Sequence, residues 1–119
     1  MIRMLGLKNC DTCKKAQNWL HRFELPFSFE DYREQRISAA DLKAYAQSLG
    51  GWEKLINKAS TTWRNLPDSR KAPGSDPEWQ LLLKEHPALI KRPLLITEDG
   101  TVSVGFSDNS YKARFGVRK

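Results

Sequence analysis

The 119-residue sequence has few residues that could hold a fold together covalently or through a metal, since it contains only two cysteines and two histidines. The cysteines stand three positions apart near the start of the chain, so they cannot cross-link a fold of this length, and no disulfide framework is expected. A zinc site needs about four ligands, and His21 and His86 lie far apart and outside any paired spacing. We therefore expect no metal site.

Long apolar runs and blocks of one charge are also missing. No segment approaches the roughly 18 apolar residues that cross a bilayer, and the first residues, which include Arg3, do not resemble a secretory signal. We therefore expect a cytoplasmic protein without membrane association. The net charge is +6, but Lys and Arg are scattered among Asp and Glu, so direct nucleic-acid binding is not expected. A basic site for a small anion fits the same charge.

The first third of the chain predicts a strand, a helix and a second strand. Residues 2–7 form a short apolar run typical of a strand, and residues 27–32 alternate at period two. Between them, four apolar residues recur at the helical spacing i, i+3, i+4 and i+7: Ala16, Trp19, Leu20 and Phe23. This spacing predicts an amphipathic helix that runs to about Phe23.

The middle of the chain is predicted to be helical. Ser38 resembles the first residue of a capping box, and the apolar period that follows predicts a helix ending at the glycine pair 50–51. Residues 52–56 are again helical in pattern, whereas residues 66–77 hold several prolines and predict an exposed connection. We expect Asp76 to cap the next helix.

The last third predicts a hairpin and a short helix. Two β-like runs, 94–97 and 101–106, flank Asp99 and Gly100, a pair that favours the positive φ angles of a tight turn. A last helix would then be capped by Ser107 or Asp108.

This order of elements predicts an α/β fold: a thioredoxin-like four-stranded mixed sheet with a helical insertion between the second and third strands. We expect a single domain over residues 1–119, because chains of about 100 to 150 residues usually form one core. Residues 1–34 and 88–119 would form the thioredoxin-like core, and residues 38–87 the insertion.

Cys10 is placed to be chemically reactive. It stands where the first strand passes into its helix, so the unpaired N–H groups and the positive end of the helix dipole face its sulfur. Such a position lowers a cysteine pKa from about 8.5 towards 7, and the same amides can hold an oxyanion. Cys13 is a candidate resolving thiol that would close a disulfide with Cys10, or it fills space as a small apolar residue.

The motif from Cys10 to Ala16, together with Trp19 and Leu20, closely resembles the ArsC/Spx family of thioredoxin-fold proteins. Further segments resemble the YffB branch of that family in order and spacing: Leu25-Pro26-Phe27, Asp31-Tyr32-Arg33, Gly51-Trp52, Thr61-Thr62-Trp63-Arg64, Lys91-Arg92-Pro93-Leu94 and Gly105-Phe106-Ser107-Asp108. The resemblance covers nearly the whole chain.

The resemblance implies a glutathione- or glutaredoxin-linked thiol oxidoreductase, similar to arsenate reductases, whose Cys10 attacks an oxyanion or a mixed disulfide. It implies that Pro93 is a cis-proline and that Arg92 points at the bound anion; the planar guanidinium fork suits that role. The expected anion-binding residues are Asn9, Asp11, Thr12, Arg64, Arg92 and Pro93. No bound cofactor is expected, and glutathione would be a co-substrate.

Two features keep other interpretations open. Arsenate reductases bring further arginines to the anion, but here one such position is Gly105, and Arg64 either substitutes for the other or is simply exposed. Spx-like regulators use a Cys-x-x-Cys pair as a redox switch while binding RNA polymerase, so a Cys10–Cys13 switch is the alternative. A redox domain that has lost its activity would instead show an ordinary thiol pKa at Cys10.

Overall fold

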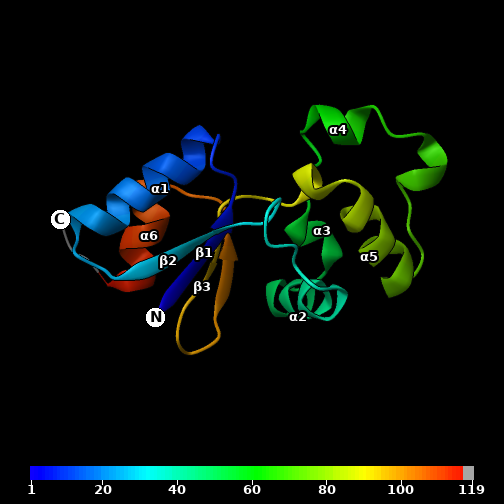
Figure 1. Ribbon diagram of the computed structural model, residues 1–119. Coiled ribbons are helices and arrows are strands. Elements are labelled where there is room, and N and C mark those ends of the chain that lie inside the picture. Colours follow the sequence, from blue (N-terminus) through cyan, green and yellow to red (C-terminus); the bar gives the residue numbers. More distant parts are fainter. Residues whose placement is uncertain (117–119) are drawn as a thin grey trace. The chain divides into compact units, whose positions relative to one another are not determined.

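The computed structural model describes residues 1–116, which divide into two compact units (Figure 1). The sheet unit consists of residues 1–34 and the segment from residue 92 onward, and the helical unit consists of residues 35–91. The four residues 88–91 therefore lie in the helical unit. The single domain with an insertion over residues 38–87 stays a prediction.

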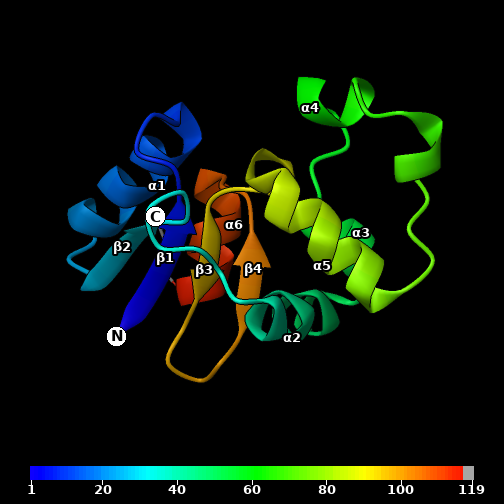
Figure 2. The ribbon, with the colours of Figure 1, turned by 45° about the vertical axis from the view of Figure 1, so that its right-hand side comes forward.

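The sheet unit contains the predicted mixed sheet of four strands, in the order β2-β1-β3-β4 (Figure 2). The strands are β1 (Ile2–Gly6), β2 (Phe27–Asp31), β3 (Leu94–Ile96) and β4 (Val102–Val104). β1 pairs with β2 in parallel and with β3 in antiparallel orientation, and β3 pairs antiparallel with β4. This arrangement confirms the predicted fold class. Because β1 lies between β2 and β3, the loop that follows it, which carries Cys10, begins in the middle of the sheet's edge.

Two helices, α1 (Asp11–Arg22) and α6 (Asp108–Phe115), lie together on one face of the sheet (Figure 1). They enclose a core of residues that share near-complete burial: Met4, Ala16, Trp19, Leu20, Leu95 and Tyr111. The apolar face that the spacing predicted for α1 is therefore the face that is buried.

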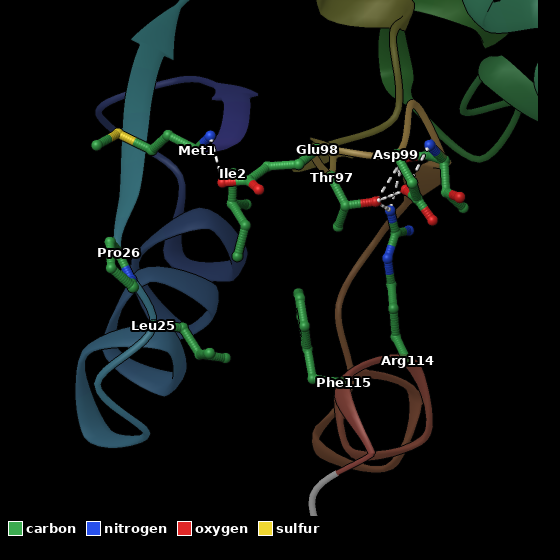
Figure 3. Close-up of a pocket in the computed structure, with 10 residues that line it drawn as sticks. Met1, Ile2, Leu25, Pro26, Thr97, Glu98, Asp99, Arg114 and Phe115 are labelled. Carbon is green, nitrogen blue, oxygen red and sulfur yellow. Dashed lines mark hydrogen bonds and ion pairs between the residues drawn. The ribbon is translucent and has the colours of Figure 1, made fainter.

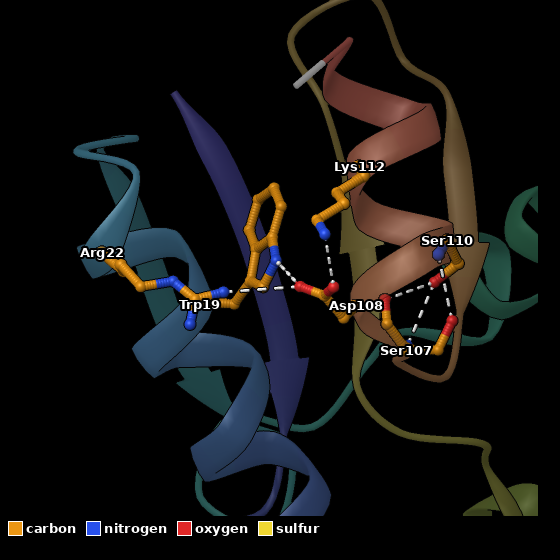
Figure 4. A network of polar contacts seen from close by, with 6 residues as sticks. All are labelled: Trp19, Arg22, Ser107, Asp108, Ser110 and Lys112. Atoms are coloured by element: carbon orange, nitrogen blue, oxygen red, sulfur yellow. Dashed lines mark hydrogen bonds and ion pairs between the residues drawn. The ribbon is translucent and has the colours of Figure 1, made fainter. Parts of the chain in front are cut away.

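Asp108 joins the two helices of this layer (Figure 4). Its carboxylate accepts a hydrogen bond from Trp19 Nε1 at 2.8 Å and pairs with Lys112 at 2.9 Å and Arg22 at 3.4 Å. The N-cap of α6 is Ser107, whose hydroxyl accepts from the Ser110 N–H at 3.0 Å. Of the two caps left open by the sequence, Ser107 is thus the one used.

The helical unit is built from short helices, three of which begin at a serine cap. They are α2 (Ala39–Leu49), α3 (Trp52–Leu55), α4 (Thr61–Arg64), η1 (Asp68–Arg70), α5 (Asp76–Glu85) and η2 (Pro87–Leu89). Ser38 caps α2 as predicted, with its hydroxyl accepting from the Asp41 N–H at 3.1 Å. Through residue 116, no helix is both long and apolar enough to traverse a bilayer.

Two predictions for this unit are wrong. The cap of α5 is Ser75, not Asp76, since the Ser75 hydroxyl accepts from the Glu78 N–H. Asp76 is instead the first helical residue, and its carboxylate accepts a hydrogen bond from Trp52 Nε1 at 2.7 Å. The connection predicted over residues 66–77 contains η1 and is not exposed throughout, because Leu66 is buried.

Candidate active site

Cys10 is the N-cap residue of α1, as the sequence predicts. Its backbone is extended, with φ −123° and ψ 119°, and its carbonyl oxygen accepts the first helical hydrogen bond from the Lys14 N–H at 3.0 Å. The side chain is partly exposed. Because an N-cap side chain faces the free N–H groups of the first turn, the Cys10 sulfur lies in the positive field at the start of the helix.

Three neighbouring groups favour the thiolate form of Cys10. Burial alone would raise the pKa of this thiol, but the Cys13 backbone N–H, the Cys13 thiol and the Arg92 guanidinium together outweigh it, so the pKa of Cys10 is lowered. The Arg92 contribution comes from both a hydrogen bond to the sulfur and direct charge attraction. A partly exposed sulfur with a lowered pKa is the state of a nucleophilic cysteine.

Cys13 has the opposite surroundings. It is 0% exposed, and burial, with a smaller contribution from the neighbouring Cys10, raises the pKa of Cys13 to about 12. Its sulfur rests against the end of β1, where a β-carbon added at Gly6 would lie only 2.6 Å from the sulfur. Gly6 is therefore required there because a side chain would occupy the space that the sulfur fills.

Arg92 reaches the sulfur from the segment that precedes β3. The peptide bond between Arg92 and Pro93 is cis, as the family resemblance implies. The guanidinium donates from Nη1 to the Tyr32 hydroxyl at 3.5 Å, and it also lowers the pKa of Cys10 through hydrogen bonding and its positive charge. Burial opposes the charge on Arg92, but these two partners keep the pKa of its guanidinium raised. The structure therefore brings Cys10, Cys13 and Arg92 together.

Asp31 fixes the loop that carries Cys10. Its carboxylate, at the end of β2, accepts hydrogen bonds from the Lys8 N–H at 3.0 Å and the Arg33 N–H at 2.8 Å. The Tyr32 N–H donates to the Gly6 carbonyl at 3.1 Å in the same region. The contacts of Asp31 with Lys8, of Tyr32 with Gly6 and of Gly6 with Cys13 join residues that are not neighbours in the sequence, so the motif alone did not reveal them.

For four other predicted anion-binding residues, the structure shows exposed side chains. Asn9, Asp11 and Thr12 are exposed and flank Cys10 along the chain. Arg64 belongs to the helical unit, where it is exposed at the end of α4 and donates to the Thr61 hydroxyl at 3.4 Å. Anion binding by these four residues stays a prediction.

The sheet unit also has a groove at the start of β1, away from the cysteines (Figure 3). Its lining is mostly apolar, with Glu98 at the rim paired to the amino group of Met1 at 2.6 Å. Neither cysteine lines it. Within residues 1–116, no group of three or more His, Cys, Asp or Glu side chains could hold a metal ion.

Comparison with known proteins finds relatives that match nearly the whole chain. An uncharacterized protein of Haemophilus influenzae is 40% identical over 117 residues, covering 97% of this chain and 99% of the relative. The global transcriptional regulator Spx of Enterococcus faecalis is 28% identical, over 94% of this chain and 84% of its own.

Solved structures give the same result. The YFFB protein is similar with a TM-score of 0.84 and 34% identity, over 95% of this chain and 97% of that one. An arsenate reductase (ArsC) related protein from Brucella melitensis is similar with a TM-score of 0.76 and 34% identity, over 98% and 95%. The ArsC family pattern matches residues 5–114, so the chain belongs to the ArsC family.

Proposed function

We propose that this protein is a thiol oxidoreductase related to the arsenate reductases, with the Cys10 thiolate as its nucleophile and glutathione or glutaredoxin as its source of electrons. One observation carries the proposal: the partly exposed Cys10 is the N-cap residue of α1, and the Arg92 guanidinium helps to lower the pKa of its thiol. The helix amides and Arg92 can neutralise an anion that binds beside this sulfur.

With a disulfide substrate, we propose a reaction in three steps. The Cys10 thiolate attacks one sulfur of the substrate, forms a mixed disulfide and releases the other sulfur as a thiolate. A glutathione thiolate then attacks the substrate's sulfur in the mixed disulfide, which restores the Cys10 thiolate and leaves the substrate joined to glutathione. A second glutathione completes the reduction, so that two glutathione molecules supply the two electrons.

An external thiol suits the second step better than Cys13. The thiol of Cys13 is fully buried, and its pKa of about 12 leaves almost no thiolate at neutral pH. Its proton serves Cys10 instead, since the Cys13 thiol stabilises the Cys10 thiolate as a hydrogen-bond donor. Cys13 is thus proposed as a supporting residue in turnover by glutathione.

The test compares two serine variants in the same assay. Glutathione-dependent reduction of 2-hydroxyethyl disulfide is followed by NADPH consumption with glutathione reductase present, and arsenate replaces the disulfide in a parallel series. Cys10→Ser should abolish turnover of every substrate used, whereas Cys13→Ser should retain much of it. Full activity in Cys10→Ser would overturn the proposal, and activity with the disulfide but not arsenate would define the substrate class.

A redox-sensing regulator is the second candidate, because Spx relatives from Enterococcus faecalis and Bacillus subtilis are 28% and 26% identical to this chain. In that case Cys10 and Cys13 would form a disulfide that controls binding to RNA polymerase in the cytoplasm. A pull-down with purified RNA polymerase under reducing and oxidising conditions separates the candidates. Redox-dependent binding without thiol turnover would favour the regulator.

A further inference from the structure

Tyr32 lies beside the candidate active site without touching solvent. Its side chain is 1% exposed, and it follows directly on the last residue of β2. Its backbone N–H is bonded to the Gly6 carbonyl at the end of β1, at 3.1 Å. The backbone of Tyr32 therefore links the end of β2 to the end of β1, where the loop that leads to Cys10 begins.

The Tyr32 hydroxyl faces the group that contacts Cys10. Arg92 Nη1 donates to this oxygen at 3.5 Å, and the same guanidinium is one of the groups that lower the pKa of Cys10, through hydrogen bonding and its charge. Burial is the main reason that the pKa of Tyr32 is raised, so the hydroxyl stays neutral and available as an acceptor at physiological pH. An arginine side chain has several rotatable bonds. A second partner that already restricts them lowers the entropy cost of holding the guanidinium at the sulfur.

We propose that the Tyr32 hydroxyl is a positioning group that holds the Arg92 guanidinium against the Cys10 sulfur. This inference rests on the proposed function, in which Cys10 is the nucleophile. Tyr32 itself does not contact the substrate in this role, and it acts only through Arg92. Its removal should weaken the stabilisation of the Cys10 thiolate without removing any charge from the site.

The sheet unit offers a matched control in Tyr111. This tyrosine is 2% exposed, and its hydroxyl has no hydrogen-bond partner among the described residues. Tyr32→Phe and Tyr111→Phe each remove one buried hydroxyl from the same unit, but only the first removes an acceptor of Arg92. Any effect of a general change in packing should therefore appear in both variants.

The measurement is the rate of iodoacetamide alkylation of Cys10 against pH, read by mass spectrometry on the intact full-length chain. In Tyr32→Phe we expect the Cys10 pKa to rise by about half a unit, which is about a threefold loss of thiolate at pH values below the pKa. Tyr111→Phe should leave the profile unchanged. Urea unfolding checks that both variants are folded, and equal profiles in all three proteins would overturn the proposal.

A double-mutant cycle tests whether Tyr32 acts through Arg92. Arg92→Ala alone should raise the Cys10 pKa, and adding Tyr32→Phe should then change it no further. An equal shift from Tyr32→Phe in both backgrounds would mean that the hydroxyl acts on the sulfur independently, which contradicts a positioning role. This readout needs no turnover, so a reactive Cys10 without reductase activity would reject the proposed function and leave the Tyr32 inference intact.

Discussion

Cys10 and Cys13 are the same residue type, three positions apart in one motif, yet their surroundings differ in every respect that governs thiol chemistry. The region around Cys10 is partly open, positively charged and bounded by the start of α1 and Arg92. The region around Cys13 is closed to solvent and bounded by the end of β1 at Gly6. The neighbouring groups, and not the thiol itself, therefore decide which sulfur is ionised.

The largest expected effect is the difference in alkylation rate between the two sulfurs. The pKa of Cys10 is lowered from its ordinary value, whereas burial raises the pKa of Cys13 to about 12. A gap of three units or more corresponds to at least about a thousandfold difference in thiolate fraction near neutral pH. Iodoacetamide at pH 7 should therefore label Cys10 almost alone, as measured by peptide mass spectrometry.

Unfolding in urea supplies the control for this comparison. Once the chain is unfolded, both thiols face solvent and should react at similar rates, because nothing then distinguishes them. Equal labelling of the two cysteines in the folded protein would break the comparison and, with it, the assignment of Cys10 as the nucleophile.

The sequence predicted the elements of this site better than their contacts. The spacing of Ala16, Trp19 and Leu20 identified the buried face of α1 because helical periodicity is a local property. The cap of α5 was assigned to Asp76 and not to Ser75, because Asp76 is bonded to Trp52, a residue 24 positions away, and no local pattern reports such a bond.

The same limit applies to the chemistry. Cys10 at the start of a helix followed from the motif, and the cis bond before Pro93 followed from the family resemblance. Tyr32 was missed as a neighbour of Arg92 because 60 residues separate them. Gly6 was missed because the need for glycine there comes from the Cys13 sulfur, which packs against this position in the tertiary structure.

The closed side of the comparison is sharpened by Gly6→Ala. The added methyl group would lie 2.6 Å from the Cys13 sulfur, a distance that forces the strand or the helix to move. Overpacking of this kind costs about 1–3 kcal/mol, so the free energy of unfolding in urea should fall by that amount. Gly74→Ala is the control, because nothing lies within 4 Å of the position and its φ is not positive.

A second substitution shows whether the loss comes from this contact. Cys13→Ala in the Gly6→Ala background removes the sulfur that the methyl group meets, so it should restore part of the lost free energy. If Cys13→Ala instead adds its own full cost to that of Gly6→Ala, the two residues do not compete for one space.

The open side is tested by Arg92→Ala. Removing the guanidinium takes away a hydrogen bond and a positive charge from the Cys10 thiolate, while the helix amides remain. We expect the pKa of Cys10 to rise by about one unit, which is about a tenfold loss of alkylation rate at pH values below the pKa. Arg64→Ala should change the alkylation profile little if its partner is only Thr61. An effect of Arg64→Ala as large as that of Arg92→Ala would assign both arginines to the site.

The smallest effect is expected at Asp31, which holds the loop before Cys10 and not the sulfur itself. Asparagine keeps one acceptor oxygen where the carboxylate has two, so one of the two backbone N–H groups of Lys8 and Arg33 loses its partner, at a cost of about 1 kcal/mol.

The effect of Asp31 should also depend on pH. The Lys8 and Arg33 N–H groups lower the pKa of Asp31 from 3.8, and they outweigh burial, which acts in the opposite direction. Because the folded pKa is the lower one, the carboxylate stabilises the fold above about pH 3.8, and this contribution is lost as the pH falls through the folded value. Urea unfolding should therefore separate wild type from Asp31→Asn at pH 6, and the gap should narrow as the pH falls below 3.8. A gap independent of pH would show that the carboxylate charge is not what holds the loop.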